Sequence, residues 1–149
     1  MKSENKIIGF TCGTFDLLHA GHILMLKEIR KQCDFLVVGL QVDPSVDRKY
    51  KNSPIQSLEE RKIQLEAVKY VDKIIQYETE HDLVGLLKWL NPNKRFVGAD
   101  WKDNPKLTGI DLPIDIVWNS RDHGYSSTEL RKRIFEKEKH SRKRKCYIL

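Results

Sequence analysis

The residues of this sequence best suited to chemistry are two histidines, His19 and His22, which stand three positions apart. On a helix, residues three apart lie side by side, so both imidazoles can face one anion. They follow a turn of small residues, Cys12-Gly13-Thr14, which comes directly after an apolar run. Backbone N–H groups in such a turn and the positive end of the following helix dipole both favour a phosphate. Residues 12–22 therefore predict a phosphate site.

A second pattern of this kind lies near the other end of the chain. Ser126 and Glu129 have the spacing of a helix capping box, which leaves the hydroxyls of Ser127 and Thr128 free to face an anion. Arg121 precedes them and can bind a phosphate through two parallel hydrogen bonds. Either pattern alone is weak, and together they predict one polyphosphate site built from two distant segments.

Strands and helices alternate along the chain in an order that would bring the two patterns together. A strand–helix–strand unit implies a right-handed crossover and parallel strands. We therefore expect a three-layer, Rossmann-like α/β fold with a mostly parallel five-stranded sheet. The long loop 41–57, which holds Lys49 and Lys51, would lie with both patterns at the carboxyl edge, where open α/β sheets bind ligands. Apolar runs and helical spacing predict strands at 7–10, 35–40, 72–77, 95–98 and 114–118, and helices at 20–32, 57–70, 83–90 and from 129 on.

Positive charge is concentrated at the C-terminal end. The 149 residues carry a net charge of +6, and residues 131–149 hold nine basic and two acidic side chains. Residues 1–130 therefore carry a net charge of −1, which argues against a domain that binds duplex nucleic acid. We expect one domain over residues 1–136 and a basic tail over 137–149.

Composition also indicates the cellular setting. The three cysteines, Cys12, Cys33 and Cys146, form no CxxC pair and predict free thiols without a disulfide framework or zinc site. No apolar stretch reaches the length of a membrane-spanning helix, and the N-terminus does not resemble a signal peptide. We expect a soluble, cytoplasmic protein.

One reaction suits the predicted polyphosphate site, namely nucleotidyl transfer. A phosphate oxygen of one substrate attacks the α-phosphorus of a nucleoside triphosphate, and pyrophosphate leaves. The protein mainly supplies cations and N–H donors around the phosphates, a task for histidine, lysine and arginine. A Mg²⁺ ion is expected to accompany the triphosphate, although no acidic cluster in the sequence defines a protein site for it.

Two segments resemble a known family. Gly13-Thr14-Phe15-Asp16 with His19-Ala20-Gly21-His22 resembles the HxGH signature of the cytidylyltransferase branch of the nucleotidyltransferase superfamily, in particular the glycerol-3-phosphate cytidylyltransferases. Residues 121–128 resemble that family's second signature, RTxGISTT. The two segments occur in the family's order, and the likeness covers residues 6–135.

The resemblance implies a role for each matching residue. His19 and His22 would bind the triphosphate and stabilise the transition state, and Arg61 would support the site from its helix. The family also implies transfer of CMP from CTP to a small phosphorylated alcohol, with glycerol 3-phosphate favoured, and a homodimer. The nucleotide would be lined by Gly13, Thr14, Phe15, Asp16, Asp100 and Trp101, and phosphates would be held by Lys49, Lys51, Arg121, Ser126, Ser127 and Thr128.

The chain departs from the family pattern at two positions. Tyr125 stands where the family has a smaller apolar residue, which leaves the acceptor open among glycerol 3-phosphate, choline phosphate, ethanolamine phosphate and sugar phosphates. Ala99 stands where an acidic residue is common, which weakens the choice of CTP over ATP. An adenylyltransferase of the same superfamily and a catalytically silent nucleotide-binding module therefore stay as alternatives.

The last residues carry a separate pattern. A basic run, Arg142-Lys143-Arg144-Lys145, precedes Cys146-Tyr147-Ile148-Leu149, which has the form of a prenylation motif. A prenyl group and a basic run would together supply the two signals needed for stable membrane attachment. The alternative is a disordered basic end that happens to contain a cysteine.

Overall fold

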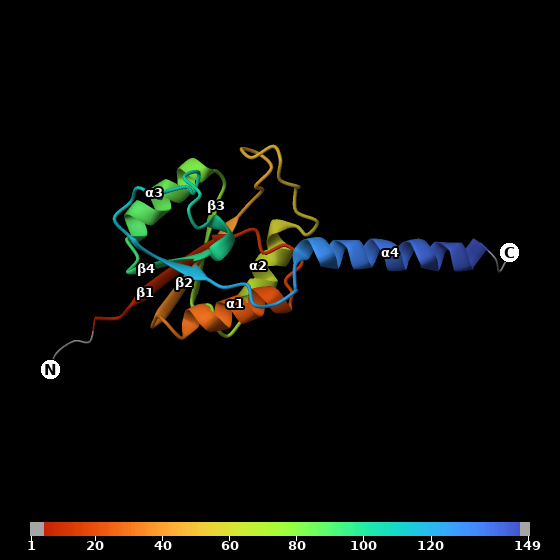
Figure 1. Ribbon diagram of the computed structural model, residues 1–149, viewed down its shortest axis with the longest axis horizontal. Helices are drawn as coiled ribbons and strands as arrows, with labels where there is room; N and C mark the ends of the chain where they lie inside the picture. The colour runs from red at the N-terminus through yellow and green to blue at the C-terminus, as the bar shows by residue number, and fades with distance from the viewer. Residues whose placement is uncertain (1–4, 147–149) are drawn as a thin grey trace.

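The structure is a computed structural model that describes residues 5–146, and its centre is a five-stranded parallel sheet (Figure 1). The strand order is β3-β2-β1-β4-β5, and every neighbouring pair runs parallel. This confirms the predicted α/β class and sheet. In chain order the elements are β1 (Ile8–Gly13), α1 (Ala20–Arg30), β2 (Phe35–Gln41), α2 (Leu58–Glu66), β3 (Lys73–Tyr77), α3 (Glu80–Leu90), β4 (Lys94–Gly98), the short 3₁₀ helix η1 (Ala99–Trp101), β5 (Asp115–Asn119) and α4 (Ser127–Cys146).

The sheet is covered on both faces. Leu36 and Val38 of β2 point to one face and pack with Leu26 of α1 and Leu65 of α2. Val37, between them, packs on the other face with the buried residues of α3. Residues 35–40 of β2 are therefore apolar because both faces of the strand are buried, as the continuous apolar run predicted.

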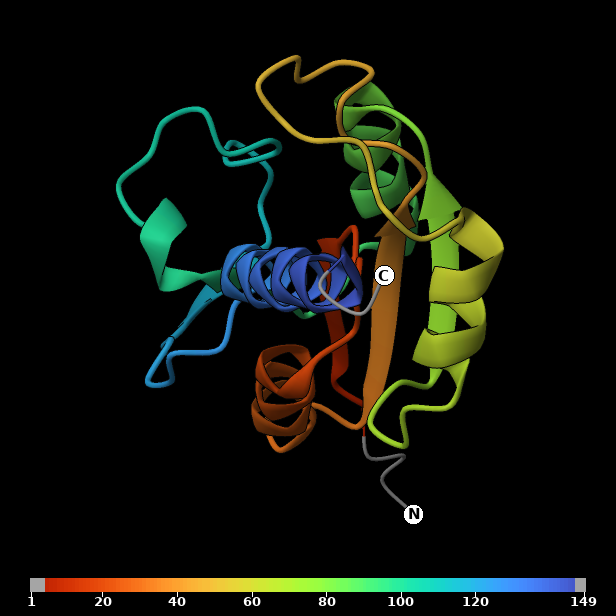
Figure 2. The ribbon, with the colours of Figure 1, turned by 90° about the vertical axis from the view of Figure 1, so that its right-hand side faces the viewer.

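The carboxyl ends of the strands carry the long connections. In Figure 2, where α4 points towards the viewer, loop 42–57 lies at the top and the segment after η1 at the upper left, both above α4. The open connections thus gather where the sequence predicted a ligand site.

Two predicted helix ends differ from the structure. The helix predicted to reach residue 70 ends at Glu66, because Ala67 and Val68 turn back through hydrogen bonds to Gln64 and Leu65. The first helix ends at Arg30, two residues earlier than predicted, and the Gln32 N–H bonds the carbonyl of Ile29. Both ends are local turns that apolar spacing does not reveal.

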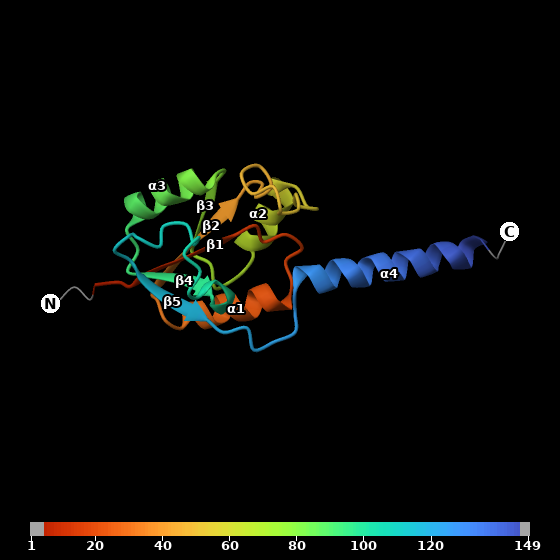
Figure 3. The same ribbon diagram turned by 45° about the horizontal axis from the view of Figure 1, so that its top comes forward.

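Helix α4 extends well beyond the body of the molecule (Figure 3). It begins two residues before the predicted start and passes residue 136 without a break, so no change of secondary structure separates residues 1–136 from the tail. Residues 137–146 are helical, which contradicts a disordered end for that stretch. Cys146 is exposed at its end, and the remaining motif residues 147–149 lie outside the described part of the chain. Among the described helices, none is long and apolar enough to cross a membrane.

Candidate active site at the carboxyl edge of the sheet

His19 and His22 form an interlocked pair at the start of α1. His19 is the N-cap residue, and its Nδ1 accepts a hydrogen bond from the Gly21 N–H at 3.0 Å. The N–H of His19 donates in turn to Nδ1 of His22 at 3.2 Å, and the two rings stack with centroids 3.9 Å apart. Both Nδ1 atoms are acceptors, so each neutral ring carries its proton on Nε2.

This arrangement keeps both rings neutral. Burial, with smaller contributions from His19 and Arg121, lowers the pKa of His22 to about 4. Burial also lowers the pKa of His19, and the nearby His123 and Arg121 add to that effect. At neutral pH the pair therefore presents Nε2–H donors without charge, and a bound polyanion would favour their protonation.

The second predicted phosphate pattern meets the first. Nε2 of His19 lies 3.1 Å from Oγ of Ser127, in the first turn of α4. The Oγ of Ser126 accepts from the N–H of Glu129 at 3.1 Å, which is the predicted helix cap. The convergence of the two segments that the sequence predicted is therefore confirmed.

Asp16 fastens three segments together. Its Oδ1 accepts from the Gln56 N–H at 2.9 Å, and its Oδ2 accepts from the Ile55 N–H at 2.9 Å and from Arg131 of α4 at 3.0 Å. Burial by itself would raise the pKa of Asp16, but these hydrogen bonds outweigh it and hold the pKa below its usual value. The carboxylate, predicted to line the nucleotide, thus holds loop 42–57 and α4 against the turn.

Arg61 supports the same turn from below. It is 2% exposed and donates to the carbonyls of Thr14, Gln41 and Val42 at 2.6 to 2.9 Å. A buried guanidinium bound to three carbonyls fixes the ends of β1 and β2 relative to each other. Its position in α2 agrees with the supporting role that the resemblance implied.

The turn between β1 and α1 has an unusual backbone. Phe15 and Leu17 have φ values of 50° and 51°, in the left-handed region that non-glycine residues rarely adopt. The ring of Phe15 is buried, with its centroid 5.3 Å from that of His22. The packing of this ring and the Leu17 N–H bond to Gln56 at 2.8 Å hold the strained turn in place.

A cavity of about 200 Å³ lies beside β5, and we call it the β5-side cavity. Asp100 and Arg121 line it and approach each other to 3.8 Å, so Arg121 pairs with Asp100 rather than with Asp122. Asn119 also lines it, is 5% exposed, and has no protein partner for either side-chain amide atom. Sequence reasoning missed Asn119, which ends an otherwise ordinary strand.

A second cavity, of about 280 Å³, lies over the ends of β1, β2 and β4, and we call it the polar cavity. It shares Met25, Gly98 and Trp101 with the β5-side cavity, so the two adjoin, and we refer to them together as the cleft. Sequence reasoning missed its principal polar residues because they come from separate elements and form no local motif. They are Thr11, Gln41, Arg48, Tyr77, Glu80, Arg95 and Thr108.

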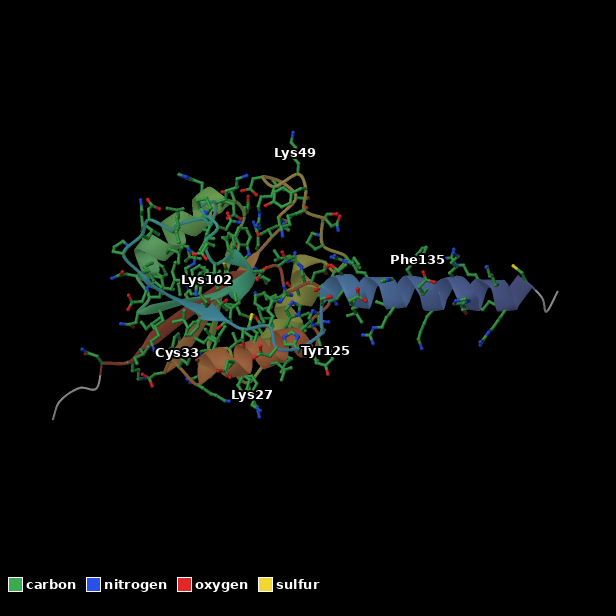
Figure 4. The ribbon with its side chains drawn as sticks, viewed as in Figure 1. Lys27, Cys33, Lys49, Lys102, Tyr125 and Phe135 are labelled. Atoms are coloured by element: carbon green, nitrogen blue, oxygen red, sulfur yellow. The ribbon has the colours of Figure 1, made fainter. Side chains whose placement is uncertain are left out.

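The two predicted lysines, Lys51 and Lys49, differ in their position relative to the cavities. Lys51 lines both the polar cavity and a third cavity of about 360 Å³, the loop cavity, whose lining includes His22, Ser127 and Thr128. Lys49 is exposed, lines none of these three cavities, and points away from the body at the tip of its loop (Figure 4). The structure therefore does not bring Lys49 to the site, although the sequence grouped it with Lys51.

The remaining predicted residues take these positions. Gly13 and Thr14 line the polar cavity, Trp101 lies between the polar and β5-side cavities, and Thr128 is exposed in the loop cavity. Within residues 5–146 no cluster of three or more His, Cys, Asp or Glu side chains could hold a metal ion.

Comparisons with known proteins agree with this site. Residues 10–133 match the model of the cytidylyltransferase-like family. The chain is 33% identical over 139 residues to the bifunctional protein HldE of Campylobacter jejuni subsp. jejuni serotype O:2, covering 93% of this chain and 30% of that protein. It is 41% identical over 101 residues to the bifunctional protein HldE of Mesorhizobium japonicum, covering 67% of this chain and 20% of that protein. The chain thus spans less than a third of these relatives.

Solved structures give the same picture. The lipopolysaccharide core biosynthesis protein from Thermoplasma volcanium GSS1 superposes with a TM-score of 0.64 at 30% identity, over 76% of this chain and 96% of that one. Pantoate-beta-alanine ligase from Francisella tularensis shares the fold, with a TM-score of 0.56 at 20% identity, over 78% of this chain and 60% of that one.

The family match ends at residue 133, so it lends no support to lipid attachment at Cys146. Because that match spans most of the chain and includes both signature segments, the protein belongs to the cytidylyltransferase-like family of nucleotidyltransferases.

Proposed function

We propose that this protein transfers a nucleoside monophosphate from a nucleoside triphosphate to the phosphate of a small polyhydroxylated acceptor. An acceptor phosphate oxygen forms a bond to the α-phosphorus, the bond from that phosphorus to the bridging oxygen breaks, and pyrophosphate leaves. The observation that carries the proposal is the contact of His19 with Ser127, which joins two phosphate-binding segments at one cleft.

Each part of the cleft has a task in this reaction. The Nε2–H groups of His19 and His22 would donate to the phosphate oxygens that gain charge in the transition state. Ser127, Thr128 and Lys51, around the loop cavity, would bind the leaving pyrophosphate. Because the donors are held by the capping bonds before a ligand arrives, little reorganisation is needed during the reaction.

A Mg²⁺ ion fits this site as a companion of the triphosphate. The described residues form no acidic cage, and Mg²⁺ is commonly held by phosphate oxygens and water with few protein ligands. When bound, it would neutralise phosphate charge.

The donor base would be read in the β5-side cavity. Asp100 and Asn119 offer oxygens that can accept a hydrogen bond from an exocyclic amine, a group that cytosine and adenine share. Uracil and guanine carry a carbonyl oxygen at the corresponding ring position. We therefore propose CTP or ATP as donor, over UTP and GTP.

The acceptor is proposed to lie in the polar cavity. Its lining of hydroxyl, amide, carboxylate and guanidinium groups suits hydroxyls better than the methyl groups of choline phosphate. Glycerol 3-phosphate and sugar phosphates both meet this requirement. The similarity to a protein named for lipopolysaccharide core biosynthesis, which concerns a saccharide, favours sugar phosphates. We also propose a homodimer, as the family resemblance implies.

A pyrophosphate-release assay tests the proposal. The four nucleoside triphosphates are each combined with glycerol 3-phosphate, hexose 1-phosphates, choline phosphate and ethanolamine phosphate. We expect turnover with CTP or ATP and a polyhydroxylated acceptor. Nucleotide binding without turnover across the whole panel would instead favour a catalytically silent binding module.

A further inference from the structure

Arg95 carries a buried charge that the protein leaves without a counter-ion. The residue is 3% exposed and lines the polar cavity. One of its terminal nitrogens, Nη1, donates to the carbonyl of Thr108 at 2.5 Å, while its Nε has no partner. Among residues 5–146, no carboxylate pairs with it. A guanidinium does not lose its proton in a protein, so this charge is permanent.

Glu80, which like Arg95 forms a hydrogen bond with Thr108, is already engaged. Its Oε1 pairs with Arg48 at 3.2 Å and accepts from Gln41 at 3.2 Å. Its Oε2 accepts from the hydroxyl of Thr108 at 2.5 Å. Glu80 therefore neutralises Arg48, and the polar cavity keeps the positive charge of Arg95. Leaving a buried charge unpaired is strongly unfavourable, so an anion supplied by a ligand would be bound tightly there.

The position of Arg95 separates this charge from the reaction centre. Arg95 is the second residue of β4 and pairs with Phe10 in the middle of β1, whereas the turn and the histidines follow the end of β1. The cavity extends from Gly13, Thr14 and Lys51 down to Arg95. An acceptor whose phosphate faces the histidines would therefore place its opposite end at Arg95.

We infer that the acceptor carries a second anionic group, a carboxylate or a second phosphate, which binds Arg95 at the floor of the polar cavity. This inference deepens the proposed transfer reaction by naming a chemical class of acceptor. Arg95 would then be a specificity-determining residue, because an acceptor with a neutral end would leave its charge unpaired.

Matched ligands test this by isothermal titration calorimetry, which requires no turnover. The probes are glucose 1-phosphate, glucose 1,6-bisphosphate and glucuronic acid 1-phosphate. They differ in a neutral, phosphate or carboxylate group at one end. We expect at least one of the two probes with a second anionic group to bind about 10- to 100-fold more tightly than glucose 1-phosphate, as hydrogen bonds between charged groups allow. The better of the two identifies the anion.

Variants test whether the preference for a second anionic group comes from Arg95 or from the overall positive charge of the protein. Arg95→Leu should remove the preference while leaving glucose 1-phosphate affinity within about twofold, and Arg95→Lys should keep part of it. Lys106→Leu is the control, because Lys106 is exposed, lies two residues before Thr108 and does not line the cavity. Arg95→Leu should also leave stability to urea unchanged or raise it, because it removes an unpaired buried charge.

Equal affinity of the wild-type protein for all three probes would overturn the inference, as would an equal loss of the preference in Lys106→Leu. If Arg95→Leu is too unstable to titrate, Arg95→Lys decides: a reduced preference supports the inference, and an undiminished one overturns it. Absence of pyrophosphate release in the earlier assay would count against the proposed reaction alone, because these titrations do not depend on it.

Discussion

The histidine end of the cleft and the floor of the polar cavity differ in how their polar groups are satisfied before a ligand binds. At the histidine end, Nδ1 of each ring has a hydrogen-bond partner and both rings are held neutral. At the floor, Arg95 keeps a full charge, and its Nε has no partner. The first region is built to position donors, whereas the second is built to select what enters. This difference suggests that reaction type and acceptor choice can be altered separately.

The largest expected effect comes from removing a donor at the histidine end. His22→Ala should lower kcat for pyrophosphate release by about 10²- to 10³-fold, as removal of one transition-state donor does elsewhere. His81→Ala is the control, because His81 is exposed near the start of α3. If His22→Ala kept nearly full activity, the histidine pair would have only a structural role, and the histidine end could not be the region that positions donors for the reaction.

The next effect concerns the support of the histidine end. Asp16→Asn should lower the free energy of unfolding by about 2 to 3 kcal/mol, because an amide placed among three donors breaks a buried charged network. Urea unfolding measures this change against Asp111→Asn, an exposed aspartate. Equal stability of the two variants would show that loop 42–57 and α4 are held by other contacts.

The neutrality of His22 predicts a pH dependence of stability. Its pKa is about 4 in the folded protein against 6.5 as reference, so the unfolded state binds more protons between these values. Stability should therefore fall as pH drops from 6.5 towards 4, by on the order of 2 to 3 kcal/mol. Asp16, whose folded pKa lies below 3.8, stabilises the protein above that pH and loses this contribution only as the pH falls below it, so the two pH ranges are separate.

Urea unfolding at several pH values checks the assignment. In His22→Gln the decrease between pH 6.5 and 4 should become shallower, while the decrease below 3.8 should stay. An unchanged curve in His22→Gln would mean that another group causes the decrease and that the ring is not held neutral.

The same contrast explains what could be predicted from the sequence. Residues 12–22 and 121–128 are short segments in which side-chain spacing and helix capping are local, so the two phosphate patterns could be predicted from them. The parallel sheet followed from the alternation of strands and helices along the chain. Asp16 was assigned to the nucleotide from the family resemblance, and its actual role could not be predicted because its partners Ile55 and Arg131 are far away in the chain. Glu80, Thr108 and Arg95 come from three elements, and only the folded sheet brings them into one cavity.

Loop 42–57 shows a further limit of sequence reasoning. Its length and position indicated a functional loop, but which of its lysines faces the site depends on the turns within it. Sequence reasoning assigned Lys49 and Lys51 of this loop to the site but not Arg48, which is the basic residue of the loop that pairs with Glu80.

The smallest expected effect tests this difference within one loop. Lys51→Ala should raise KM for the triphosphate roughly tenfold, since Lys51 lines both the polar and loop cavities, while Lys49→Ala should change it less than about twofold. Both variants remove the same charge from the same loop, so each is the control for the other in steady-state kinetics. Equal effects would mean that the loop acts through its overall charge. A larger effect of Lys49→Ala would mean that the loop moves on binding and brings Lys49 inward, and the histidine end would then be completed by the ligand rather than formed in advance.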